Sequence, residues 1–490
     1  KAKETAWVAA AILTVAALAP GVARANVVVS SGVTENMSCS AGVCSPTAVD
    51  AVLNVNDLEN LLASGDVDVT TNGADVQADS IEIDAPISWA QDSSLTLDAY
   101  VSVLVNKRLA VAGPGSLSIT TNDGGAQGVL LFGAKGSATF AQTSSNLSIN
   151  GVTYALMDSL KNIIRAIKAD PSGSFALAKS YNVPKHLSYR TAAIKTPFAG
   201  NFNGLGNSIS RLHISGHVRS ANYGMFANVE ASANISSLRI ADETIEAGEK
   251  SLVGGIAAVN YGTVFNSAAD GTITATSSLV GNYGGAVGSN RGIMVDVVAN
   301  TGIVIGPREA GQMVVGGLVG GSDGSIEESY STGSISVTGR VTEPYIGGLV
   351  GYNGGDVQNC YANVSVSANG KGGYALAGGL IGWNFLNISS SYSTGALVAS
   401  GAGNEIGGLI GLDESQTNGG SIEAAYWDTT TSGITDPGQG AGNIPNDPGI
   451  EGETSKQLRG NLPNGFDPSI WAEDKKINNG FPYLINNPPS

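Results

Sequence analysis

Five acidic residues in the second half of the chain could supply the paired carboxylates of a polysaccharide-degrading enzyme: Asp296, Asp323, Glu327, Glu328 and Asp356. Cleavage of a glycosidic bond uses two carboxyl groups, one as acid and the other as base or nucleophile. When the repeats described below are aligned, Asp296 and Glu328 share a column, but the two following repeats have Asn359 and Ser390 there. Glu327 and Glu328 are neighbours in a strand-like run and should point to opposite faces. We therefore predict no catalytic residues, with a carbohydrate-active β-helix enzyme as the alternative.

A cluster of basic residues could instead bind an anionic partner. Between positions 161 and 219 the chain has nine Lys or Arg and one acidic residue, although its formal net charge is −16. This excess would attract an acidic polysaccharide or the phosphates of lipopolysaccharide, and salt would weaken the attraction. The alternative is a solvated helix and loop without a ligand. The candidate docking patch consists of Lys161, Arg165, Lys168, Lys179, Lys185, Arg190 and Lys195.

The cysteines and histidines offer little metal chemistry. Cys39 and Cys44 could close a small disulfide loop in an oxidising compartment, and the alternative of a zinc site lacks nearby His. Cys360 should face inward. His213 and His217 fall in a strand-like run that would place them about 13 Å apart, too far to share one ion. We predict no metal site and no cofactor.

A repeat determines where all these residues lie. Gly-Gly pairs recur, with second glycines at 255, 285, 317, 348, 379 and 408, which are 29 to 32 residues apart. Each unit contains three short β-type runs separated by Gly and Asn, without helical periodicity. A propeller blade would need about four strands and 40 or more residues. The sequence therefore predicts an all-β fold, a right-handed parallel β-helix with coils of about 30 residues.

Equivalent residues of successive coils should stack about 4.8 Å apart in columns. Two columns stand out. One is an amide ladder that would satisfy its own hydrogen bonds at a turn, formed by Asn260, Asn290, Asn353 and Asn384. The other is an aromatic ladder, formed by Tyr330, Tyr361, Tyr392 and Tyr426. Packing of ring against ring is the preferred interpretation of the tyrosines, and stacking on sugars is the alternative.

The repeat also resembles a known motif. The Gly-Gly-Leu-Val-Gly core followed by Asn, with VQNCY at 357–361 and SYSTG at 391–395, resembles the GLUG motif of secreted bacterial surface proteins. Upstream, residues 198–212 look like the entry coils of GLUG arrays, and together with residues 117–125 they resemble filamentous-haemagglutinin-like adhesins. The resemblance implies an exported adhesin. The peptidase motif His-Glu-x-x-His, carried by some GLUG-bearing chains, does not occur.

Other segments complete the expected organisation. Residues 26–152 alternate polar and apolar positions, as strands with one buried face do. The stretch 154–168 has apolar residues at helical spacing and ends before Asp170 and Pro171, which predicts one inserted amphipathic helix against the solenoid or its junction. Residues 1–25 read as a signal peptide, with Lys1 and Lys3, an apolar run at 6–19 and a small-x-small site at 23–25. A membrane-anchored N-terminus is the alternative.

The expected domains are a signal peptide (1–25), a haemagglutinin-like β-helix section (26–152), a basic helical insertion (153–195), a GLUG-repeat β-helix (196–434) and an irregular C-terminal segment that could cap the stack (435–490). The acidic composition excludes a nucleic-acid partner. We expect a non-enzymatic adhesin-like protein, secreted or on the cell surface or outer membrane, whose partner is a glycan or protein receptor. No transmembrane span is expected in the mature chain. A structural envelope or matrix component is a further alternative.

Overall fold

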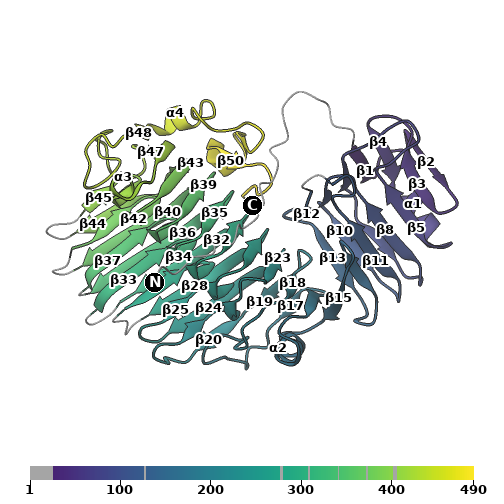
Figure 1. Cartoon of the computed structure of the whole chain (residues 1–490), viewed down its shortest axis with the longest axis horizontal. Helices are drawn as coiled ribbons and strands as arrows, with labels where there is room; N and C mark the ends of the chain where they lie inside the picture. The colour runs from purple at the N-terminus through teal and green to yellow at the C-terminus, as the bar shows by residue number, and fades with distance from the viewer. Residues whose placement is uncertain are drawn as a thin grey trace, which may run out of the picture.

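The chain winds into a parallel β-solenoid of about 11 turns with few helices, in agreement with the repeat. The structure is a computed structural model and describes residues 26–125, 128–275, 280–306, 310–339, 341–370, 374–400 and 405–489. The predicted signal peptide lies outside these residues. Two stacks of coils form an arc, with the N-terminal stack in purple and blue and the second stack in teal to green (Figure 1). Among the described residues, no helix is long and apolar enough to cross a membrane.

The first stack is built from short strands in three groups. One sheet has the order β12 (Leu130–Phe132), β9 (Val103–Val105), β6 (Ser80–Ile83), β1 (Asn26–Ser30) and β4 (Ala51–Asn54). A second contains β13 (Ser137–Phe140), β10 (Arg108–Val111) and β7 (Ile87–Trp89). The third group runs through β3 (Val43–Pro46), β5 (Val67–Thr70), β8 (Ser94–Asp98), β11 (Ser116–Thr120) and β14 (Leu147–Ile149). Antiparallel partners flank it, with β2 (Met37–Ser40) beside β3 and β15 (Val152–Met157) beside β14.

Alternation in the sequence produces the core of this stack. In β8 and β11 every second residue is buried, so that Leu95 lies opposite Leu117 and Leu97 opposite Ile119. Stacked apolar side chains of this kind stabilise adjacent coils by about 25 cal/mol per Å² of apolar surface removed from water.

The second stack has four faces, and on each face the strands of successive coils pair in parallel. The first face consists of β21 (Asn222–Tyr223), β25 (Leu252–Val253), β29 (Gly281–Gly284), β33 (Ala310–Gly316), β37 (Val341–Gly347), β41 (Leu376–Gly378) and β45 (Glu405–Gly407). The second consists of β22 (Phe226–Val229), β26 (Ala257–Asn260), β30 (Val287–Asn290), β34 (Val319–Ser322), β38 (Val350–Asn353), β42 (Ile381–Asn384) and β46 (Ile410–Asp413).

The other two faces follow in each coil. The third face consists of β16 (Ser174–Leu177), β18 (Asn201–Asn203), β23 (Asn234–Ser236), β27 (Thr263–Phe265), β31 (Ile293–Val295), β35 (Ser325–Glu327), β39 (Asp356–Gln358), β43 (Asn387–Ser393) and β47 (Ile422–Asp428), the last of which also pairs with β48 (Ile450–Glu453). The fourth consists of β17 (Tyr181–Asn182), β19 (Ser208–Ser210), β20 (His213–Ser215), β24 (Arg239–Ala247), β28 (Ala268–Ala275), β32 (Val298–Ile305), β36 (Tyr330–Gly339), β40 (Tyr361–Gly370) and β44 (Leu397–Ser400).

The repeated Gly-Gly pair forms the corner between the first and second faces. At Gly316 and Gly347 a Cβ atom would lie 1.9 Å from the carbonyl oxygen of the residue three positions on. At Gly348 it would lie 2.1 Å from the carbonyl oxygen of Gly379 in the next coil. Only glycine permits both contacts, and this explains why the pair recurs in six successive coils.

The prediction of a single inserted helix needs correction. The helix near 154–168 is α2 (Leu160–Ala169), because Ser159 caps its N-terminus while residues 152–157 form β15 instead. Its buried residues Leu160, Ile163 and Ile167 join the core of the second stack, and α2 lies where the two stacks meet (Figure 1). The described residues also contain α1 (Val55–Leu62), α3 (Ser415–Asn418) and α4 (Ser455–Leu458). These helices are too short for their periodicity to be read from the sequence.

Candidate functional site

A column of unusual backbone conformation runs along the second stack between its third and fourth faces. One residue of each coil there has a left-handed backbone, with φ between 44° and 56°. Asn and Asp tolerate this conformation, whereas Glu is uncommon in it. We call these residues the turn column: Ser237, Asn266, Asp296, Glu328, Asn359, Ser390 and Ala424.

The turn column brings Asp296 and Glu328 together on successive coils. Asp296 is 2% exposed and Glu328 7% exposed. Burial, followed by the Glu328 carboxylate, raises the pKa of Asp296 well above its ordinary value. Burial and the neighbouring Glu327 raise the pKa of Glu328 to about 7, against a hydrogen bond from Asn486. Two carboxylates this buried cannot both carry charge without a positive partner.

The C-terminal segment, residues 455–489, folds back over the turn column and appears in yellow along one edge of the second stack (Figure 1). Trp471 Nε1 donates to Asn359 Oδ1 at 3.1 Å, and Ser390 Oγ donates to the carbonyl oxygen of Gly465 at 3.0 Å. Within the segment, β49 (Trp471–Ala472) pairs with β50 (Tyr483–Leu484). The segment therefore covers the side of the last coils.

The same segment buries the tyrosine ladder. The rings of Tyr330 and Tyr361 are stacked with centroids 4.6 Å apart, and those of Tyr361 and Tyr392 with centroids 5.2 Å apart. Tyr426 pairs in register with Tyr392, and its ring meets Phe466 of the C-terminal segment edge-on. All four tyrosines are at most 5% exposed, so they act as packing residues in this arrangement and offer no free ring face to a sugar.

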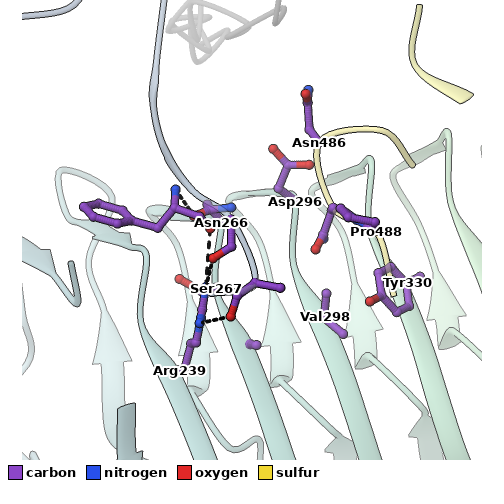
Figure 2. A pocket seen from close by; sticks show the side chains of 13 residues that line it. Arg239, Asn266, Ser267, Asp296, Val298, Tyr330, Asn486 and Pro488 are labelled. Carbon is purple, nitrogen blue, oxygen red and sulfur yellow. Dashed lines mark hydrogen bonds between the residues drawn. The ribbon is translucent and has the colours of Figure 1, made fainter. Parts of the chain in front are cut away.

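A cavity of about 250 Å³ lies where three distant parts of the chain meet beside Asp296 (Figure 2). One wall is the loop after β12, where Arg239 donates to the carbonyl oxygens of Gly133 at 2.6 Å and Ala134 at 2.9 Å. The floor includes Asn266 and Asp296 of the turn column, and the opposite wall is the end of the C-terminal segment at 486–488. Figure 2 shows the Asp296 carboxylate directed toward Asn486 and away from Arg239.

All seven residues of the predicted docking patch are exposed. Lys161, Arg165 and Lys168 lie on α2, on the side away from its buried residues. The others lie on the coil that begins the second stack but on different sides of it, because Tyr189 pairs with Ile214 of the fourth face and Ile194 pairs with Phe226 of the second. The structure thus places the basic residues around one coil. Within the described residues, none of the seven forms an ion pair.

The remaining sequence-predicted residues have structural roles. Cys39 and Cys44 form a disulfide across the β2–β3 hairpin, and Cys360 is buried. In the amide ladder, Asn260 Nδ2 donates to Asn290 Oδ1 at 2.8 Å. Asn353 and Asn384 repeat the same bond at 2.8 Å. No group of three or more His, Cys, Asp or Glu able to hold a metal ion occurs in the part of the chain that the structure describes.

The Asp296–Glu328 column is visible in the sequence, but the cavity beside it is not. Later coils do not repeat the acids, so the column alone does not indicate a site. Arg239 and Asn486 carry no local signal, since the cavity forms from segments that are more than 100 residues apart in sequence. Glu328 gave one usable signal, because it is a long acidic side chain at a position that elsewhere holds Ser, Ala, Asn or Asp.

The comparisons with known proteins concern the repeat alone. A search of curated proteins finds no match to this chain. The sequence profile of the GLUG motif matches twice, at residues 311–338 and 343–367. Each match begins on the first face and ends on the fourth, so that it covers most of one coil. The chain therefore contains two recognised copies of the GLUG motif within a longer β-solenoid.

Proposed function

We propose that this chain is an exported, non-enzymatic, adhesin-like protein that attaches to glycans or receptors on host surfaces or neighbouring cells. The observation that carries the proposal is a set of seven exposed Lys and Arg side chains, three on α2 and four on the coil that follows it. They form no ion pairs among the described residues, in a chain of net charge −16. Unpaired cationic side chains attract polyanions even on a protein whose net charge is negative. A stacked solenoid supplies a long, rigid support for such a zone.

Binding to immobilised acidic polysaccharide tests this proposal. The variant Lys161→Ala/Arg165→Ala/Lys168→Ala should lose most retention at low salt, because it removes three neighbouring charges from α2. The matched control Lys456→Ala/Lys475→Ala/Lys476→Ala removes the same charge from exposed positions in the C-terminal segment and should retain binding. Equal retention of both variants, or retention that does not weaken with salt, would contradict an electrostatic adhesin site.

A carbohydrate-active enzyme is the second candidate, and the buried pair Asp296 and Glu328 is the observation that favours it. Glycosidases use two carboxyl groups, one of them protonated. Against this function, the Asp296 carboxylate is enclosed, and a sugar could reach it only if the C-terminal segment moved. New chain ends in the same polysaccharide samples, absent from an Asp296→Asn/Glu328→Gln variant, would establish the enzyme and refute the adhesin. Self-association without retention would instead favour a structural role.

A further inference from the structure

The cavity beside the turn column contains buried oxygen atoms without a positive partner. Both carboxylate oxygens of Asp296 are buried and have no hydrogen-bond partner among the described residues. Nδ2 of Asn487, another residue that lines the cavity, is buried without an acceptor. A native protein rarely leaves such groups unsatisfied, and an ion or ordered water is a common explanation.

No side chain in the described part of the chain neutralises this pair of acids. Arg239 is the basic residue that lines the cavity, and its guanidinium donates to the carbonyl oxygens of Phe132, Gly133 and Ala134. It is therefore committed to the loop of the first stack, as its hydrogen bonds in Figure 2 show. Burying two carboxylates without a cation would cost several kcal/mol, so the site favours a bound positive charge.

The available ligand atoms select the class of cation. Asp296 and Asn486 line the cavity, and the Glu328 carboxylate lies beside them: it neighbours Asp296 on the next coil and accepts a hydrogen bond from the Asn486 carboxamide. Calcium accepts carboxylate, amide and water oxygens at flexible geometry, whereas zinc prefers His and Cys, and none of the cavity-lining residues is His or Cys. A cavity of about 250 Å³ has room for an ion with several of its waters.

We infer that Asp296 and Glu328 bind a calcium ion with the help of Asn486 and water, and that this ion fastens the end of the C-terminal segment to the turn column. The three ligand residues come from two adjacent coils and from the chain end, so the ion joins parts that only the tertiary structure brings together. This inference is independent of the proposed adhesin function.

Thermal unfolding of the full chain, in EDTA and in increasing calcium chloride, tests the inference. We expect Tm to rise by several degrees and to reach a plateau at millimolar calcium, because an ion that binds only the folded chain stabilises the folded state. Magnesium should give a smaller shift, since it loses its waters reluctantly. The Asp296→Asn/Glu328→Gln variant keeps the side-chain shapes and should lose the calcium response. The control Asp323→Asn/Asp356→Asn removes two exposed acids of the same stack and should keep it.

Limited proteolysis provides a second measurement that does not depend on global stability. Calcium should protect the C-terminal segment of the wild type from cleavage at least tenfold, and should not protect the Asp296→Asn/Glu328→Gln variant. The inference is overturned if calcium changes neither Tm nor protection in the wild type, because the acids then hold a proton instead. It is also overturned if the double variant responds as the wild type does, because the ion then binds elsewhere.

Discussion

Replacing Glu243 with Gln should change how the stability of the second stack depends on pH. Glu243 is on β24, is 1% exposed, and has no hydrogen-bond partner for either carboxylate oxygen among the described residues. Two glycines make room for it: a Cβ at Gly255 would lie 2.2 Å from its Oε1, and one at Gly271 would lie 2.5 Å from its Cγ. Burial, with Asp270 as a second cause, raises the pKa of Glu243 well above its ordinary value.

The magnitude follows from proton linkage. The folded chain binds the Glu243 proton more tightly than the unfolded chain, and this difference adds to the free energy of unfolding. The added stability is complete below the unfolded pKa of about 4.5. It decreases by about 1.4 kcal/mol per pH unit as pH rises toward the folded pKa. Between pH 4.5 and 7 the wild type should therefore lose up to roughly 3 kcal/mol that Glu243→Gln retains. Burying the Gln amide has a cost that does not depend on pH, so it lowers the stability of the variant equally at pH 4.5 and at pH 7.

Hydrogen exchange of β24 and β28 is a suitable assay, because solenoids can open locally and a global transition need not be two-state. Exchange rates, corrected for their intrinsic pH dependence, give the free energy of opening at each pH. The control Glu246→Gln changes an acid of the same strand that is only partly buried and accepts a hydrogen bond from Ser215. A difference between Glu243→Gln and the wild type that stays constant from pH 4.5 to 7 would refute the reasoning.

Three further predictions concern the repeat itself. Tyr361→Ala should cost about 3 to 5 kcal/mol and expose the C-terminal segment to protease. Tyr361→Phe keeps the stacked ring and should cost at most about 1 kcal/mol in thermal melts, because it removes only the hydroxyl contact with Tyr330. Gly348→Ala should prevent soluble expression, because its Cβ would collide with the Gly379 carbonyl; Gly302→Ala, whose nearest neighbour lies 3.8 Å away, should express normally. Asn384→Ala should cost about 1 to 3 kcal/mol in urea unfolding, since buried donors and acceptors of adjacent coils lose their partner; an unchanged midpoint would contradict the ladder.

The sequence was sufficient to predict the coil because the same short-range requirement recurs every 29 to 32 residues. Each coil has three local features that its own residues determine. They are a corner that tolerates only Gly, a turn that ends in Asn or a similar polar residue, and strands that alternate in burial. Stacking then follows from the repetition. For this reason the amide and tyrosine columns could be aligned from residue numbers alone, and the basic residues on α2 could be expected on an exposed surface.

The environment of the acids was decided by tertiary structure. Asp296 and Glu328 could be placed in one column from sequence, but their burial depends on the C-terminal segment, which contacts coils more than 100 residues earlier. Arg239 could have been their counter-ion, but its guanidinium donates hydrogen bonds to the carbonyl oxygens of the loop at 132–134 instead. The basic residues that follow α2 were expected as one patch, but the path of their coil distributes them over several faces. A repeat determines contacts between neighbouring coils, whereas contacts made by its non-repeating ends depend on where the complete stack brings them.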